Sequence, residues 1–140
     1  MALLAYLLYA SHGGNAAALG ALAERAKPHV EKTIRDEDRR KAALHALSRA
    51  TKDIDALTGR IEKDLGRFEK LVQDYGSRPE DFDRLFETAA EADLRQADEI
   101  WKDRAELLAH VGPEEWSAIV AGARADAAED AAKAHEGKTE

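Results

Sequence analysis

Glu106 and His110 come nearest to a metal site in this sequence, because they place a carboxylate and an imidazole one helical turn apart. A metal centre needs more than two such ligands, and the Glu-x-x-His pairs of di-iron helical bundles do not occur in the chain. The absence of cysteine also excludes thiolate ligands, disulfides and cysteine nucleophiles. We therefore assign no metal ligand and no cofactor, and we expect His110 to interact with a helix C-terminus.

Three carboxylates at positions i, i+4 and i+8 form an acidic ridge, made of Asp83, Glu87 and Glu91. Such a ridge could hold a hydrated cation, but this spacing is more typical of the solvated face of a helix. The five histidines fall in different segments, and no combination of serine, histidine and acid stands out as a catalytic triad. No Lys-Ser or Lys-Thr follows Gly13-Gly14, so a phosphate-binding loop is absent. We assign no catalytic residue and expect the protein not to be an enzyme.

Asp93 and Arg104 are two further charged residues, placed beside the apolar face of one predicted helix. They stand about 16 Å apart along that helix at 1.5 Å per residue, so they cannot pair with each other. Each is expected to meet a partner on another helix or to reach water along its aliphatic stem. Charges in such positions usually fix how helices align and less often catalyse a reaction.

The charge balance argues against a nucleic-acid partner. The net charge is −7 at pH 7, whereas binding to a phosphate backbone needs a basic face. Residues 36–75 carry nine basic and nine acidic side chains, but residues 77–111 carry five basic and ten acidic ones. A positively charged partner is slightly favoured over a negatively charged one, although an acidic face that aids solubility explains the same excess.

One apolar stripe organises the chain, with steps of three, four or seven residues that keep a single helix face apolar. It consists of Leu44, Leu47, Ile54, Ile61, Leu65, Phe68, Val72 and Tyr75. The spacing predicts a helix over residues 37–75, with Asp36 as its N-cap. Thr51 and Thr58 interrupt the stripe, and a hydroxyl that bonds back to the carbonyl one turn earlier makes their burial acceptable.

A tight turn is predicted directly after this helix. Gly76 suits a left-handed C-terminal cap, Ser77 and Glu80 have the spacing of a capping box, and Pro79 fits the first turn of the next helix. The next helix is predicted over residues 79–111. A connection this short makes the two helices antiparallel neighbours, with Leu47 facing the 97–111 segment.

A shorter helix is predicted on each side of the hairpin. Residues 16–34 form the first, capped by Asn15 and bent near Pro28, and residues 113–134 form the second after Gly112-Pro113. The start Pro113-Glu114-Glu115-Trp116 resembles the helix starts of short helical proteins of bacterial envelopes, a likeness of four residues that defines no family.

Residues 1–23 carry no Asp, Glu, Lys or Arg, and they allow three interpretations. They form a short helix packed on the bundle, a secretory signal with an unusual start, or a membrane anchor that gives the protein a membrane association. We divide the chain into an apolar N-terminal segment (1–14), a helical bundle domain (15–134) and a disordered tail (135–140). The compartment stays open between the cell envelope and the cytoplasm.

The sequence therefore predicts an all-α protein, in which a long antiparallel helical hairpin is joined by two shorter helices that complete a four-helix bundle at one end. At the other end, large apolar side chains flank the turn, and two helices alone cannot enclose them all. We expect this tip to bind a protein partner or a second copy of the chain by helix packing, as a non-enzymatic interaction or scaffold module. The alternative function is a helical bundle that binds a small ligand or a metal cation. The interaction residues are Phe68, Leu71, Tyr75, Phe82 and Phe86.

Overall fold

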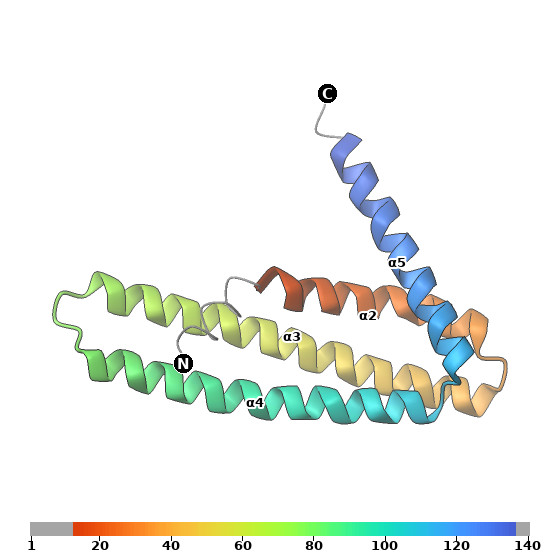
Figure 1. The fold of residues 1–140 in the computed structure, drawn as a ribbon, viewed down its shortest axis with the longest axis horizontal. Coiled ribbons are helices and arrows are strands. Elements are labelled where there is room, and N and C mark those ends of the chain that lie inside the picture. The colour runs from red at the N-terminus through yellow and green to blue at the C-terminus, as the bar shows by residue number, and fades with distance from the viewer. Residues whose placement is uncertain (1–12, 137–140) are drawn as a thin grey trace.

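Four helices and no strand make up the described part of this computed structural model, residues 13–136, with side chains from Gly20 to His135 (Figure 1). The predicted all-α class is confirmed. No described helix has the length and apolar character needed to cross a membrane. The helices are α2 (Gly13–Thr33), α3 (Glu37–Gln73), α4 (Pro79–Ala109) and α5 (Pro113–Glu136).

The segments at both chain ends fall partly outside the described residues, which exclude 1–12 and 137–140. The three interpretations of the apolar N-terminal segment therefore remain predictions. Asn15 lies inside α2, which is already helical at Gly13, so the expectation that Asn15 caps this helix is wrong. Pro28 lies inside α2, and the helix continues through it to Thr33 as one element.

α3 and α4 form the long antiparallel hairpin that the sequence predicts (Figure 1). Contacts step in opposite directions along the two helices: Leu47 shares a core cluster with Leu107, Arg60 bonds to Asp93, and Phe68 packs against Phe86. This alignment confirms the predicted register. At 37 residues, α3 extends about 55 Å, and it carries the largest number of buried residues among the described helices.

The end of the hairpin opposite the turn is a four-helix bundle. α2 packs on α3, and α5 packs on α2. The most deeply buried large side chains are Val30, Ile34 and Ile119, from α2, the connection after it, and α5. Further along, α5 points away from the hairpin (Figure 1). The core cluster draws on all four helices and consists of Ala26, Val30, Ile34, Ala43, Ala46, Leu47, Leu107, Val111, Ile119 and Ala123.

Side chains satisfy the backbone at the start and in the middle of α3 as predicted. Asp36 Oδ1 accepts a hydrogen bond of 2.8 Å from the Arg39 N–H, which makes Asp36 the N-cap. Thr51 Oγ1 donates to the Leu47 carbonyl and Thr58 Oγ1 to the Ile54 carbonyl, each at 3.0 Å. These local bonds let two hydroxyls lie within an otherwise apolar seam.

The turn between α3 and α4 differs in detail from the prediction. α3 ends at Gln73, and no described glycine has a positive φ, so Gly76 is not a left-handed cap. Instead Asp74 Oδ1 accepts a bond of 2.9 Å from the Gly76 N–H, which turns the chain without a left-handed residue.

The cap of α4 also differs, although the helix begins at Pro79 as expected. The N-cap residue is Arg78, and its N–H donates to Asp81 Oδ2 at 3.0 Å. The predicted pairing of Ser77 with Glu80 is wrong by one position, because Ser77 Oγ is buried and makes no hydrogen bond. The Asp81 carboxylate therefore accepts the N-cap hydrogen bond that the sequence assigned to Glu80.

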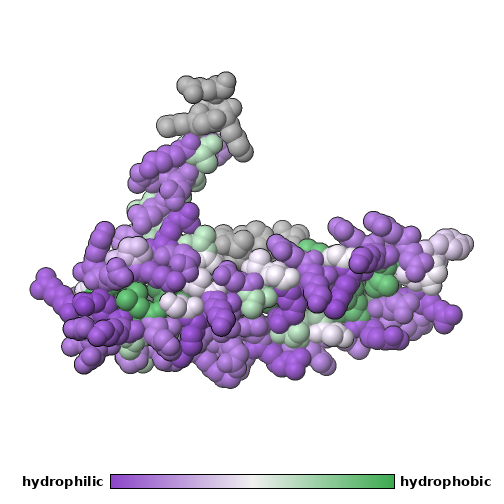
Figure 2. Space-filling model, turned by 180° about the vertical axis from the view of Figure 1, so that it is seen from behind, coloured by the Kyte–Doolittle hydropathy of each residue, from purple (hydrophilic) through white to green (hydrophobic). Residues whose placement is uncertain are grey.

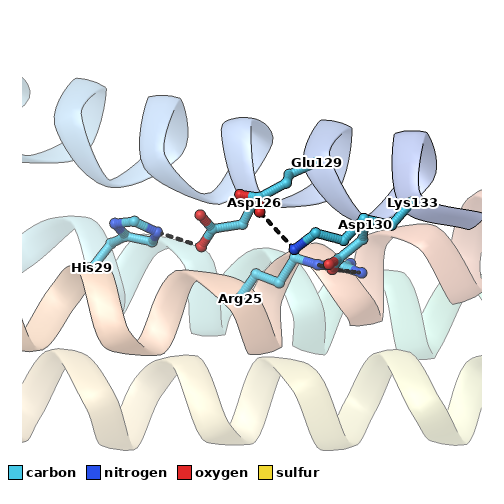
Figure 3. Close-up of polar contacts among 6 residues, drawn as sticks. All are labelled: Arg25, His29, Asp126, Glu129, Asp130 and Lys133. Atoms are coloured by element: carbon cyan, nitrogen blue, oxygen red, sulfur yellow. Dashed lines mark hydrogen bonds and ion pairs between the residues drawn. The ribbon is translucent and has the colours of Figure 1, made fainter.

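Polar side chains of α2 and α5 meet along the contact between these helices, as Figure 3 shows for His29 with Asp126 and Arg25 with Asp130. His29 Nε2 lies 2.7 Å from Asp126 Oδ2, and Arg25 Nη2 lies 3.0 Å from Asp130 Oδ2. Gly122 faces the His29 ring, where a Cβ atom would stand only 2.3 Å from Nδ1. The glycine therefore lets the two helix backbones approach, and the neighbouring Asp126 holds the imidazole in place.

We predict that Gly122→Ala loosens α5 from α2. The added methyl group would overlap the ring, and the ring cannot turn aside without losing Asp126. The expected cost is about 1–3 kcal/mol. Hydrogen exchange should show faster exchange of the α5 amides, with a lowered melting temperature.

Gly59→Ala is the matched control, since nothing lies within 4 Å of a Cβ atom placed at this exposed position of α3. Replacing glycine by alanine in a helix interior is expected to stabilise the protein by about 0.5–1 kcal/mol. If Gly122→Ala stabilises the protein as much as Gly59→Ala does, the close packing of His29 on Gly122 is wrong.

Candidate functional site

Glu106 lies against α3 rather than in a cluster of metal ligands. Arg49 Nη2 donates to Glu106 Oε2, and Arg49 Nε donates to Asp103 Oδ1 at 3.1 Å. The hydrogen bond from Arg49 is the main cause that lowers the pKa of the Glu106 carboxyl below its ordinary value. Within residues 20–135, no three His, Asp or Glu side chains group in a way that could hold a metal ion.

Asp93 meets a partner on another helix, as the sequence analysis expects. Arg60 on α3 donates Nε and Nη2 to Asp93 Oδ1, at 3.2 and 3.0 Å. Burial raises the pKa of the Asp93 carboxyl, and Arg60 opposes that shift. Arg104 remains exposed on α4, with its guanidinium carbon 5.5 Å from the centre of the Trp101 ring. The members of the acidic ridge, Asp83, Glu87 and Glu91, are all exposed.

Asp103 is the most unusual titratable group of the α3/α4 seam. Its side chain is almost fully buried, and its Oδ2 atom has no hydrogen-bond partner. Burial is the main cause that raises the pKa of the Asp103 carboxyl, and contact with the Asp53 carboxyl adds to it. Arg49 opposes the rise by favouring the charged form. A neutral, protonated Asp103 could donate a hydrogen bond to Asp53, whereas the charged form leaves an acceptor unpaired.

Asp103 and Asp64 are not among the residues predicted from the sequence, although the spacing around both indicates burial. Asp103 follows Ile100 by three residues and precedes Leu107 by four, which is an apolar position of the stripe. Asp64 stands in the same way between Ile61 and Phe68. It is buried and is bonded by Arg67 at 3.1 Å. An acidic residue that occupies an apolar position of a helical stripe therefore predicts a buried carboxylate at both sites.

At the hairpin tip, the three phenylalanines pack on one another. The Phe68 ring lies 5.9 Å from the Phe82 ring and 5.8 Å from the Phe86 ring, centre to centre. Phe86 is buried, and the other two are half-buried. Tyr75, by contrast, is completely exposed at 105% of its reference surface, and Val72 is 61% exposed. The predicted interaction residues thus divide into a packed aromatic cluster and a free edge at the turn.

Leu71 lies apart from that cluster, in a shallow open groove of about 420 Å³ between α3 and α4. Leu71 and Leu85 are its apolar residues, and three cations, Arg67, Lys70 and Arg84, surround them. Asp81 and Thr88 complete the lining. Figure 2 shows apolar surface at the end of the molecule that carries the turn, between hydrophilic side chains. The tip therefore offers an apolar surface with a mainly cationic rim.

Comparison with protein families, curated proteins and solved structures finds no match to this chain. The chemistry of the tip and of the α3/α4 seam is therefore the basis for any functional argument.

We predict that Asp103→Asn raises the free energy of unfolding at pH 7 by about 1 kcal/mol, since an amide can donate to Asp53 and removes a buried carboxylate with an unpaired oxygen. Folding raises the pKa of the Asp103 carboxyl above its unfolded-state value. The protonated carboxyl of the wild type therefore contributes its full stabilisation of the folded state below the unfolded-state pKa. That contribution is lost as pH rises through the folded-state pKa. The advantage of the variant should shrink as pH falls toward 4, measured by urea unfolding across pH.

The exposed Asp83 of the same helix provides the control. Asp83→Asn should leave both the stability and its pH dependence within about 0.5 kcal/mol of the wild type. An unchanged or larger advantage of Asp103→Asn at pH 4 would contradict the raised pKa.

Proposed function

We propose that the protein is a non-enzymatic helical interaction module, which binds another protein chain through the hairpin tip. The observation that carries this proposal is the complete exposure of Tyr75 at the turn, on the same hairpin tip as a groove with two leucines in its lining. Tyrosine is enriched at the centres of protein interfaces, because it combines a large apolar ring with a hydroxyl group. Cations around the groove would add specificity for a partner with acidic side chains.

The tip contains both packed and exposed apolar side chains, and this difference supports the proposed function. The packed phenylalanines hold the two helices together where, among the described elements, only α3 and α4 reach. Tyr75 is completely exposed and Val72 is 61% exposed, so most of their apolar surface is available to a partner. Other exposed large side chains, Leu94 and Trp101, lie on α4 away from the turn.

A small ligand with an apolar body and an anionic group is a second candidate occupant of the tip. The groove volume of about 420 Å³ falls within the range of small-molecule sites, about 300–1,000 Å³. The groove is open rather than enclosed, however, which suits a flat protein surface better than a ligand that must be buried on most sides. We therefore place the protein partner first.

We predict that Tyr75→Ala separates binding from folding. The exposed ring contributes little to the folded state, so the stability should stay within about 0.5 kcal/mol of the wild type. Phe86→Ala, in contrast, should cost about 3 kcal/mol, because it removes a buried ring from the aromatic cluster. Thermal unfolding of the two variants tests the division.

The binding itself is tested by placing a photo-reactive phenylalanine analogue at position 75 of the full chain and irradiating cells that produce it. Cross-linked species of higher mass are expected at position 75 and not with the same group at position 131, which is exposed on α5. No cross-linked protein at position 75, or equal products at both positions, would refute a binding role for the tip.

A further inference from the structure

The turn of the hairpin and the groove on the same tip have complementary chemistry. The turn presents a carboxylate and an aromatic ring side by side, on Asp74 and Tyr75. The groove presents Leu71 and Leu85 among three cations and one carboxylate, that of Asp81, so its lining carries a net positive charge. Within one chain these two surfaces do not meet, because the Tyr75 ring is completely exposed and does not line the groove.

We propose that two copies of the chain join tip to tip, and that the Asp74-Tyr75 turn of each copy occupies the groove of the other. This inference rests on the proposed function, since it takes the tip as the binding surface and names its partner as a second copy. A pair related by a two-fold axis makes each such contact twice, so one modest surface yields a closed dimer.

Charge complementarity supports a second copy as the occupant. Asp74 Oδ1 already accepts the Gly76 N–H at 2.9 Å, and the residue is exposed, so the carboxylate has further acceptor capacity for an outside cation. Lys70 and Arg84 make no ion pair with any other residue in the described part of the chain, whereas Arg67 is bonded to Asp64. The two free cations of the groove therefore match the carboxylate that the partner's turn would bring.

The ring of Tyr75 fits the remaining features of the groove. Its apolar edge would cover Leu71 and Leu85, which are only half-buried in the single chain. The face of a tyrosine ring also attracts guanidinium and ammonium groups, so the cationic rim favours the aromatic side chain itself. Because the turn and the groove are small, the dimer belongs to the weak, transient class, with a dissociation constant on the order of 10–100 µM.

A charge swap tests the proposal on the purified full chain, by sedimentation equilibrium over a wide range of concentrations. Asp74→Arg places like charges in both contacts of the dimer, and so does Arg84→Asp. Each variant alone should therefore associate at least about tenfold more weakly than the wild type. A one-to-one mixture of the two variants restores an Asp–Arg pair in both contacts and should recover the wild-type association.

Tyr75→Ala should also weaken association about tenfold or more. Trp101→Ala, at a position that is 64% exposed on α4 but far from the turn, should leave association unchanged. A wild type that stays monomeric at every concentration, a mixture that associates no better than its components, or equal effects of Tyr75→Ala and Trp101→Ala would each overturn the proposal.

The outcomes also separate this inference from the proposed function. If the purified chain is monomeric but position 75 cross-links to a different protein in cells, the tip binds a partner and the second-copy proposal fails alone. If position 75 yields no cross-link at all, both fail.

Discussion

α3 buries apolar side chains against two neighbouring helices, α2 and α4. The positions of these two helices depend on that burial. α4 covers it along the hairpin, and α2 covers its first part, where Gly20 approaches Ile54. α5 packs mainly on α2, and Arg39 of α3 also bonds to Glu115 at the start of α5. The main contacts therefore run in the spatial order α4, α3, α2, α5. Only at the bundle end do all four helices contribute to one core. Removing the apolar face of α3 would remove the packing surface of both α2 and α4, and would leave only the contact between α2 and α5.

The seam between α3 and α4 combines this apolar burial with ionic contacts. Arg60 with Asp93 and Arg49 with Asp103 each join the two helices, so a shift of one helix along the other would separate both pairs. Such contacts add less to stability than apolar packing would, because buried charges lose their hydration. Their benefit is that they favour one alignment, which an apolar seam rich in alanine specifies only weakly.

Unequal coverage of α3 also explains why the tip differs from the bundle end. α2 begins at Gly13 and lies beside the first part of α3, so within the described residues the tip consists of two helices (Figure 1). Two helices share one sheltered seam, and the phenylalanines fill it. Tyr75 and Val72 come at the end of the same stripe, and no helix among residues 13–136 covers them. The turn end of the hairpin thus leaves large apolar side chains exposed, as Leu94 and Trp101 are exposed further along α4.

The sequence by itself determined the helices, the hairpin and its register. A single apolar stripe of helical period predicts α3, Asp36 and Pro79 mark helix starts, and a short turn forces the two long helices together. These features depend on residues close in sequence, whose spacing is visible directly. The capping residues at the turn were harder to predict from the sequence. Several neighbouring residues could cap the same backbone groups, and Asp74 and Asp81 do so in the structure.

Only the tertiary structure decided which charges pair and which large side chains remain exposed. Arg60 and Asp93, like His29 and Asp126, come from different helices and meet only once those helices pack. The same holds for the close approach at Gly122 and for the groove around Leu71 and Leu85. Phe68 and Tyr75 share one stripe in the sequence, yet one packs against α4 and the other lies in solvent. The physical reason is that burial depends on the position of the neighbouring helix, which periodicity along one helix does not specify.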